Sequence, residues 1–238
     1  MSTLFIAGAT GYTGRALVQV GLDAGHNVIA HIRPGSPSGD RAATDIAAAG
    51  ATVDRTPWEE GALTATLQGH GPHAVFALLG TTRAKAAAAA KRGESATYES
   101  IDRDLSLMLH RSCAAQSPPP RFVYLSSLGA DKPGGNRYMK ARYDVEQALQ
   151  QGSVPWTVAR PSFLTGPDRD ESRPGERIGA FFGDAALGAL AAVGVRGPRD
   201  RFASLTGEQV ARSLLRIALD DQAQGKFFEA ESLRPLST

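Results

Sequence analysis

Three glycines near the start of the chain constrain its fold more than any other feature. Gly8, Gly11 and Gly14, here called the glycine loop, follow the apolar run 4–7 and open the amphipathic stretch 13–24. The first glycine allows a tight turn, the second lets the backbone approach a pyrophosphate, and the third lets helix and strand pack closely. A helix N-terminus adds free N–H groups and a positive dipole end. This context predicts a dinucleotide-binding strand–turn–helix, with a tight turn that binds no ligand as the alternative.

Short apolar runs alternate with helical patterns along the rest of the chain. We expect strands at residues 4–7, 27–32, 51–54, 74–79, 122–126, 156–159 and 227–230. We expect helices at residues 13–24, 40–49, 59–68, 98–115, 138–150 and 206–220. Strands that alternate with helices predict βαβ units and a mostly parallel sheet. The fold class is therefore α/β, with one doubly wound Rossmann domain over residues 1–238.

Two segments interrupt this regular pattern. Residues 161–201 are rich in Pro, Gly, Arg and Asp, with a short apolar helix expected at 178–190. We interpret this segment as a substrate-side elaboration of the same domain. The alanine run 86–90 predicts a short surface helix, because alanine favours helices.

Composition narrows the functional classes. The chain has 238 residues, a net charge of +2 and one cysteine, Cys113, which we expect in the core. We find no signal-peptide pattern, no long apolar run and no strongly basic region, so we expect a cytoplasmic protein that binds neither membrane nor nucleic acid. Metal-ligand motifs are absent, so we predict no metal site. Single histidines, expected at surfaces or turns, are His26, His31, His70, His73 and His110.

The end of the second expected strand bears on the choice of cofactor. An acidic residue there would bind the ribose hydroxyl of NAD. The chain instead has Arg33, whose guanidinium suits a 2′-phosphate, and Ser36 and Ser38 offer further donors. The pattern favours NADP(H) over NAD(H), with an exposed surface arginine as the alternative.

Hydroxyl side chains gather after the fifth expected strand. Ser126 and Ser127 end that strand, and Tyr138 opens the next helix. Ser127 and Tyr138 can both donate to a substrate carbonyl, with Tyr138 as general acid for reduction. The alternatives are strand-end capping for the serines and a half-buried helix-start aromatic for Tyr138.

A cation one helical turn after the tyrosine completes the pattern. Arg142 lies at i+4 from Tyr138, on the same helix face, whereas Lys140 at i+2 should point elsewhere. Arg142 can stabilise a tyrosinate and bond to ribose hydroxyls, but it cannot readily relay a proton.

These motifs together resemble the short-chain dehydrogenase/reductase superfamily, in its extended or atypical branch. The residues 78–83, 102–104, 125–132 and 170–176 resemble the oxidoreductase family named for Tat-interacting protein. The resemblance implies a Rossmann fold, NADPH binding, and Ser127 and Tyr138 as catalytic residues. The cofactor residues that the resemblance, the glycine loop and the end of the second strand together indicate are Gly8, Thr10, Gly11, Tyr12, Thr13, Gly14, Arg33, Asp54, Arg55, Leu79, Gly80, Thr81, Pro161, Ser162 and Phe163.

One departure keeps alternatives open. The superfamily's Tyr-x-x-x-Lys becomes Tyr138 to Arg142. The leading hypothesis is an NADPH-dependent oxidoreductase that acts on a small carbonyl or related substrate. The first alternative is a non-catalytic, NADPH-sensing regulatory protein with a protein partner. The second is a nucleotide-sugar epimerase or dehydratase, for which the chain is short.

Overall fold

The computed structural model describes residues 1–35, 39–81, 83–91, 93, 96–162, 164–165 and 204–237. Most of the expected substrate-side segment 161–201, with Phe163 and the helix expected at 178–190, lies outside the described residues, as do Ser36 and Ser38.

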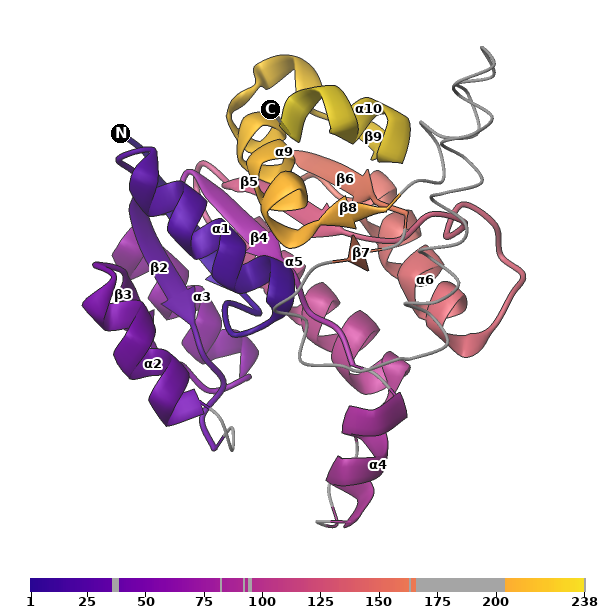
Figure 1. The fold of residues 1–238 in the computed structure, drawn as a ribbon, viewed down its shortest axis with the longest axis horizontal. Coiled ribbons are helices and arrows are strands. Elements are labelled where there is room, and N and C mark those ends of the chain that lie inside the picture. Colours follow the sequence, from indigo (N-terminus) through magenta and orange to yellow (C-terminus); the bar gives the residue numbers. More distant parts are fainter. Residues whose placement is uncertain are drawn as a thin grey trace.

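A seven-stranded parallel sheet forms the centre of the structure (Figure 1). Its strands are β1 (Thr3–Ala7), β2 (Asn27–His31), β3 (Thr52–Asp54), β4 (Ala74–Ala77), β5 (Arg121–Leu125), β6 (Trp156–Arg160) and β9 (Lys226–Glu229). Their order is β3-β2-β1-β4-β5-β6-β9, and every pairing is parallel. The order reverses between β1 and β4, whose register pairs Ala7 with Ala77. All seven strands expected from the sequence are confirmed, with shifts of one or two residues at their ends.

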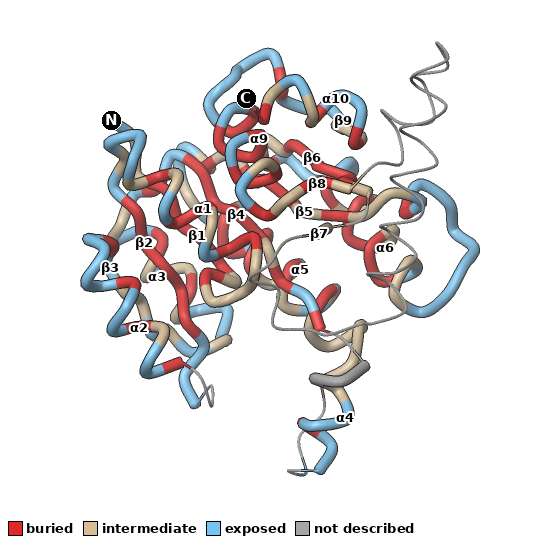
Figure 2. Tube along the Cα trace, in the orientation of Figure 1, coloured by how far each residue is buried: buried red, intermediate tan, exposed pale blue. Residues whose placement is uncertain are grey.

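Helices cover both faces of the sheet. They are α1 (Tyr12–Asp23), α2 (Gly39–Ala48), α3 (Glu60–His70), α5 (Leu105–Ala114), α6 (Arg137–Gln151) and α9 (Gly207–Leu219). Leu4 and Ile6 of β1 pack into a core with α1, α2 and α9, whereas Phe5 and Ala7 pack into a core with α3, α5 and α6. Figure 2 shows the strands buried between helices whose outer faces are exposed. Burial of both faces explains why the strand sequences are apolar without alternation.

The helix expected at 98–115 is two elements. Residues Tyr98–Asp104 form a π-helix, η1, and α5 continues from Leu105. Thr97 and Ser100 begin η1 with a reciprocal capping box. A π-helical turn changes which residues share a face. The single α-helix that the hydrophobic pattern predicted over 98–115 is therefore wrong for its first seven residues, which form the π-helix η1.

Shorter elements complete the described chain. They are α4 (Arg83–Lys91), the two-stranded sheet β7 (Leu164–Thr165) and β8 (Leu205–Thr206), η2 (Asp221–Ala223), α10 (Ala230–Leu233) and η3 (Arg234–Ser237). Helix α4 contains the alanine run 86–90 and confirms that expectation. The sequence did not predict β7, β8 or the two C-terminal helical turns. Among the described residues, no helix has the length and hydropathy that a membrane crossing requires.

Candidate active site

The glycine loop closes tightly between β1 and α1. Gly8 has a φ of +89°, and a Cβ there would lie 2.6 Å from the carbonyl oxygen of Leu78. A Cβ on Gly14 would overlap the carbonyl oxygen of Gly8. Helix α1 begins after Gly11, and no side chain caps its first N–H groups. Gly8 and Gly14 thus allow the tight turn and the close packing of backbone, and the uncapped helix N-terminus fits a pyrophosphate.

The loop lies where the strand order reverses. Strands β1 and β4 are neighbours, and the helices α1 and α5 pack on opposite faces of the sheet. In open α/β sheets, ligands bind at such a switch point, outside the carboxyl ends of the strands. Leu79, Gly80 and Thr81, here called the 79–81 loop, follow β4 at this edge. The glycine loop and the 79–81 loop therefore flank the expected cofactor crevice.

The other glycine-loop residues are held by the protein in different ways. The hydroxyl of Tyr12 donates to the carbonyl of Thr165 in β7 at 2.7 Å. A Cβ on Gly207, at the start of α9, would lie 2.8 Å from the Tyr12 ring. Thr13 is buried, and Thr10 is half-buried. Tyr12 therefore ties the glycine loop to β7 and α9.

The residues expected at the adenosine end also differ in their contacts. Arg33, after β2, is exposed and has no hydrogen bond or ion pair to another described residue. Arg55, after the neighbouring strand β3, pairs with Asp40 at 2.8 Å. Asp54 accepts from the N–H and hydroxyl of Thr56 at 3.1 and 2.9 Å. Arg33 and Arg55 thus leave adjacent strand ends, whereas the Asp54 carboxylate is engaged within the protein.

The two serines after β5 have different environments. Ser126 is buried, and its hydroxyl donates to Glu146 at 2.5 Å. Glu146 also binds the guanidinium of Arg160 at 3.1 and 2.6 Å. Ser127 is half-buried, and its hydroxyl has no hydrogen bond to another described residue. The Ser126 hydroxyl is therefore bonded to a buried carboxylate within the protein, and Ser127 stays the candidate for substrate contact.

Helix α6 presents Tyr138 in its first turn. Asn136 caps this helix by accepting from the Met139 N–H at 3.0 Å. The Tyr138 ring packs against Tyr98 of η1 with centroids 5.3 Å apart, and Arg142 Cζ lies 5.2 Å from its centroid. The Tyr138 hydroxyl has no hydrogen bond to another described residue. Arg142 thus lies beside Tyr138, as the i+4 spacing predicts.

The Arg142 guanidinium is buried, and all its Nη hydrogens are bonded within the protein. Nη1 donates to the Leu125 carbonyl at 2.6 Å and the Tyr124 hydroxyl at 3.2 Å. Nη2 donates to the Leu79 carbonyl at 2.9 Å and to Asp102 Oδ1 at 2.8 Å. Burial acts to lower the pKa of Arg142, but Tyr124 and Asp102 help to raise it above its ordinary value. These bonds use every Nη hydrogen within the protein, whereas the buried Nε has no hydrogen-bond partner among the described residues. A bond from Arg142 to a ribose hydroxyl stays a prediction.

Asp102 contacts Arg142 and the 79–81 loop, although reasoning from the sequence named it only within the 102–104 resemblance and gave it no role. Its side chain is fully buried on η1, and Oδ2 accepts from the Thr81 N–H at 2.8 Å. Burial raises the pKa of Asp102, while the nearby Arg142 charge opposes that rise. One signal was present in the sequence, because Asp102 begins a stripe of buried positions continued by 106, 109 and 113. Glu146 was missed in the same way on α6.

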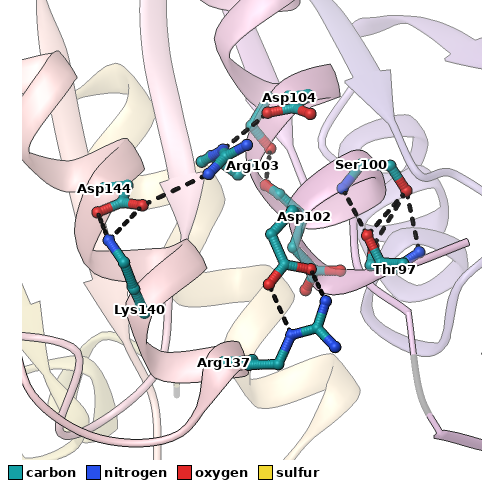
Figure 3. A network of polar contacts seen from close by, with 10 residues as sticks. Thr97, Ser100, Asp102, Arg103, Asp104, Arg137, Lys140 and Asp144 are labelled. Carbon is teal, nitrogen blue, oxygen red and sulfur yellow. Dashed lines mark hydrogen bonds and ion pairs between the residues drawn. The ribbon is translucent and has the colours of Figure 1, made fainter.

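Exposed ion pairs also join η1 to α6. Arg137 binds Glu99 through two contacts of 2.8 Å, which holds the pKa of Glu99 down at about 2. Figure 3 shows Arg103 and Lys140 both directed at Asp144. Lys140 therefore points away from the tyrosine two residues before it, as predicted.

The segment after β6 lies beside the loop that contains Ser127. Pro161 is buried, and its carbonyl accepts from the Leu128 N–H at 3.0 Å. Ser162 is half-buried. The first two of the three residues expected near a nicotinamide are thus held close to the candidate catalytic serine.

Two histidines expected at surfaces or turns are buried instead. His31 packs edge-on against Trp58, and its Nε2 lies 2.9 Å from the Thr56 carbonyl oxygen. His110 packs against Phe122. Burial lowers the pKa of both imidazoles.

Cys113 lies in the core, as expected. The described residues contain no group of three or more His, Cys, Asp and Glu side chains placed to hold a metal ion.

Comparison with known proteins identifies the family. A family model described as NAD(P)H-binding matches residues 8–193, which span both loops and the Ser127–Tyr138 pair. The chain belongs to this NAD(P)H-binding family. Its residues 8–14 and 79–81 thus lie within the matched region.

Two relatives and one solved structure support this assignment. Protein HTATIP2 of Rattus norvegicus is 32% identical over 186 residues, covering 76% of this chain and 70% of that protein, which confirms the resemblance to the Tat-interacting-protein family. Protein fmp52, mitochondrial, of Emericella nidulans is 30% identical over 115 residues, covering 48% of this chain and only 46% of that protein. A Bacillus halodurans structure provisionally named as an NAD-dependent epimerase/dehydratase aligns with a TM-score of 0.65 and 17% identity over 99% of each chain. This last likeness establishes the Rossmann-like fold alone.

Proposed function

We propose that the protein is an NADPH-dependent oxidoreductase of the short-chain dehydrogenase/reductase type, acting on a small carbonyl or related compound. A contrast between hydroxyl groups at the carboxyl edge of the sheet supports this proposal. Ser126 and Tyr124 are bonded to buried charged groups, and burial raises the pKa of Tyr124. Ser127 and Tyr138 have hydroxyls without a partner among the described residues. The pair that resembles the superfamily's catalytic residues is therefore the pair left for a substrate.

The cofactor is proposed to bind across the switch point. The uncapped N-terminus of α1 would bind the pyrophosphate, and Gly11 would let the backbone approach it. The 79–81 loop, with Pro161 and Ser162, would line the nicotinamide half. Arg33 would meet the 2′-phosphate, and this contact would favour NADPH over NADH.

In the proposed reaction, the protein side chains handle the carbonyl oxygen. The chemistry supplied by bound NADPH is a hydride for the carbonyl carbon. Ser127 donates a hydrogen bond to the oxygen, and Tyr138 transfers its phenolic proton to that oxygen, which yields the alcohol. The charge of Arg142, 5.2 Å from the ring centroid, stabilises the tyrosinate until solvent returns a proton.

The matched substitutions Tyr138→Phe and Tyr143→Phe test this proposal. Both remove one hydroxyl from α6, but Tyr143 lies at i+5 from Tyr138 and so does not share its helix face. With NADPH and a panel of aldehydes and ketones, Tyr138→Phe should reduce turnover by about 10²–10⁴-fold, while Tyr143→Phe should leave it unchanged. Equal turnover in the wild type and Tyr138→Phe would remove Tyr138 as the general acid.

The second candidate function is NADPH-dependent regulation without turnover. The specific observation in its favour is Arg142, which is bonded within the protein and cannot relay a proton as a lysine can. This alternative expects NADPH to bind without being consumed by any carbonyl in the panel. A cytoplasmic location also stays a prediction, since the fungal relative is named as mitochondrial.

A further inference from the structure

One buried ion pair reaches both ends of the 79–81 loop. Asp102 on η1 and Arg142 on α6 are joined by a contact of 2.8 Å. Arg142 donates to the Leu79 carbonyl at 2.9 Å, and Asp102 accepts from the Thr81 N–H at 2.8 Å. The pair therefore fixes the loop at its first and last residues.

Gly80, the middle residue of the loop, packs directly on this pair. A Cβ on Gly80 would lie 3.0 Å from Arg142 Nη2 and 3.5 Å from Asp102 Oδ1. The carbonyl of Leu78, just before the loop, lies so close to Gly8 that only glycine fits there. The ion pair thus packs against the middle of the 79–81 loop, and the residue just before that loop contacts Gly8.

The same guanidinium also contacts the candidate acid. Arg142 Cζ lies 5.2 Å from the centroid of the Tyr138 ring. Tyr98 faces that ring from η1, and the paired Glu99 and Arg137 lie at the same junction. Arg142 is the charged side chain stacked on the ring among the described residues. Its position therefore bears on how readily Tyr138 loses a proton.

Stability alone gives little reason for such a pair. A buried ion pair carries a large desolvation cost, and apolar side chains of similar volume are often equally stabilising or better. A role at the site would explain why a charged pair is present. The pair holds the loop backbone through hydrogen bonds, and its Arg142 places a positive charge beside the Tyr138 ring.

We propose that Asp102 is a positioning residue: by fixing Arg142, it holds the 79–81 loop in the shape that binds NADPH and sets the charge felt by Tyr138. This inference rests on the proposed function for its cofactor part. Its electrostatic part concerns the protein alone and is measurable without any ligand.

The test uses three variants and one control of the whole chain. Asp102→Asn removes the negative charge, Arg142→Gln removes the positive charge, and the double variant removes both. Lys140→Gln is the control, because it removes one exposed positive charge from the same helix. The readouts are the NADPH dissociation constant and the titration of the Tyr138 phenol, followed by NMR of ring-labelled tyrosine in the ligand-free protein.

The two single variants should move the Tyr138 titration in opposite directions. Asp102→Asn leaves Arg142 uncompensated, which favours tyrosinate and moves the titration midpoint to lower pH. Arg142→Gln removes the positive charge beside the ring and should move the midpoint to higher pH. The double variant should lie between them, and Lys140→Gln should match the wild type. If neither variant moves the Tyr138 midpoint, or if both move it in the same direction, the claim that Asp102 and Arg142 set the charge beside Tyr138 is overturned.

The double variant separates positioning from folding. It leaves no unpaired buried charge, so it should fold even where a single variant does not. We expect it to bind NADPH about tenfold more weakly than the wild type, equal to about 1.4 kcal/mol. Wild-type affinity in the folded double variant would overturn the loop-positioning part. A wild type that binds no NADPH would overturn the proposed function, and the tyrosine titration would still decide whether Asp102 acts on Tyr138.

Discussion

The two ends of the proposed cofactor site hold their arginines differently. At the adenosine end, Arg33 and Arg55 follow β2 and β3 and are exposed. At the catalytic end, Arg142 and Arg160 are buried, and each contacts a carboxylate with no exposed surface. Exposed charges are free to meet a ligand at little cost to folding, whereas buried charges are coupled to the stability of the fold. Substitutions at the first end should change affinity, and those at the second should change stability and geometry together.

The largest expected effect lies in the buried network around Glu146. Glu146→Ala removes the buried carboxylate that binds both Arg160 and Ser126, and leaves the Arg160 guanidinium with the longer contact of 3.5 Å to the partly exposed Glu229. We expect the free energy of unfolding in urea to fall by about 3–5 kcal/mol. Glu208→Ala, which breaks an exposed i,i+4 pair on α9, should change it by less than about 1 kcal/mol. Similar losses in the two variants would contradict the distinction between buried and exposed charges.

Adjacent serines offer a test within the catalytic end. Ser127→Ala should reduce carbonyl turnover by about 10²–10³-fold, the usual result of removing one donor to a reacting oxygen, with little change in stability. Ser126→Ala should instead lower the free energy of unfolding by about 1–3 kcal/mol, because the buried Glu146 loses a hydrogen bond. Carbonyl turnover and urea unfolding, both measured on each variant, show whether Ser127→Ala mainly slows turnover and Ser126→Ala mainly lowers stability. If Ser126→Ala instead had the slower turnover, Ser126 and not Ser127 would be the serine that contacts the substrate oxygen.

At the adenosine end, the effect should be one of affinity. Arg33→Ala should weaken NADPH binding by about tenfold, or about 1.4 kcal/mol, and leave NADH binding unchanged. Arg41→Ala removes an equal charge from the exposed side of α2 and serves as the control. If both substitutions weaken NADPH and NADH alike, Arg33 does not recognise the 2′-phosphate.

The smallest expected effect comes from a buried neutral histidine. Burial lowers the pKa of His31 in the folded state, so the unfolded chain binds a proton more readily than the folded protein does. Stability should therefore fall as pH drops below about 6.5, the ordinary imidazole value. The variant His31→Gln should lose stability less steeply over that range in parallel urea titrations. A variant with the same pH dependence as the wild type would exclude His31 as a contributor.

The regular part of the molecule could be predicted from the sequence, because it depends on local patterns. Apolar runs predicted all seven strands. The glycine spacing predicted the turn after β1, where the close approach of Leu78 to Gly8 leaves no room for a side chain. Side-chain contacts between residues far apart in the sequence could not be predicted, because they depend on how the elements pack together. Asp102 and Arg142 lie 40 positions apart, and no spacing rule joins them.

Calorimetric titration with NADPH and NADH tests the central claim, that the switch point between β1 and β4 binds NADPH. The informative pair is the wild type and Gly11→Ala, whose new methyl group would lie 3.2 Å from the Gly8 carbonyl oxygen at an ordinary φ of −72°. This variant should fold but obstruct the approach of a pyrophosphate. We predict that the wild type binds one NADPH at least about tenfold more tightly than NADH, and that Gly11→Ala loses at least about tenfold in NADPH affinity at an unchanged melting temperature. Binding of neither nucleotide by the wild type, or equal NADPH affinity in Gly11→Ala, would contradict the claim.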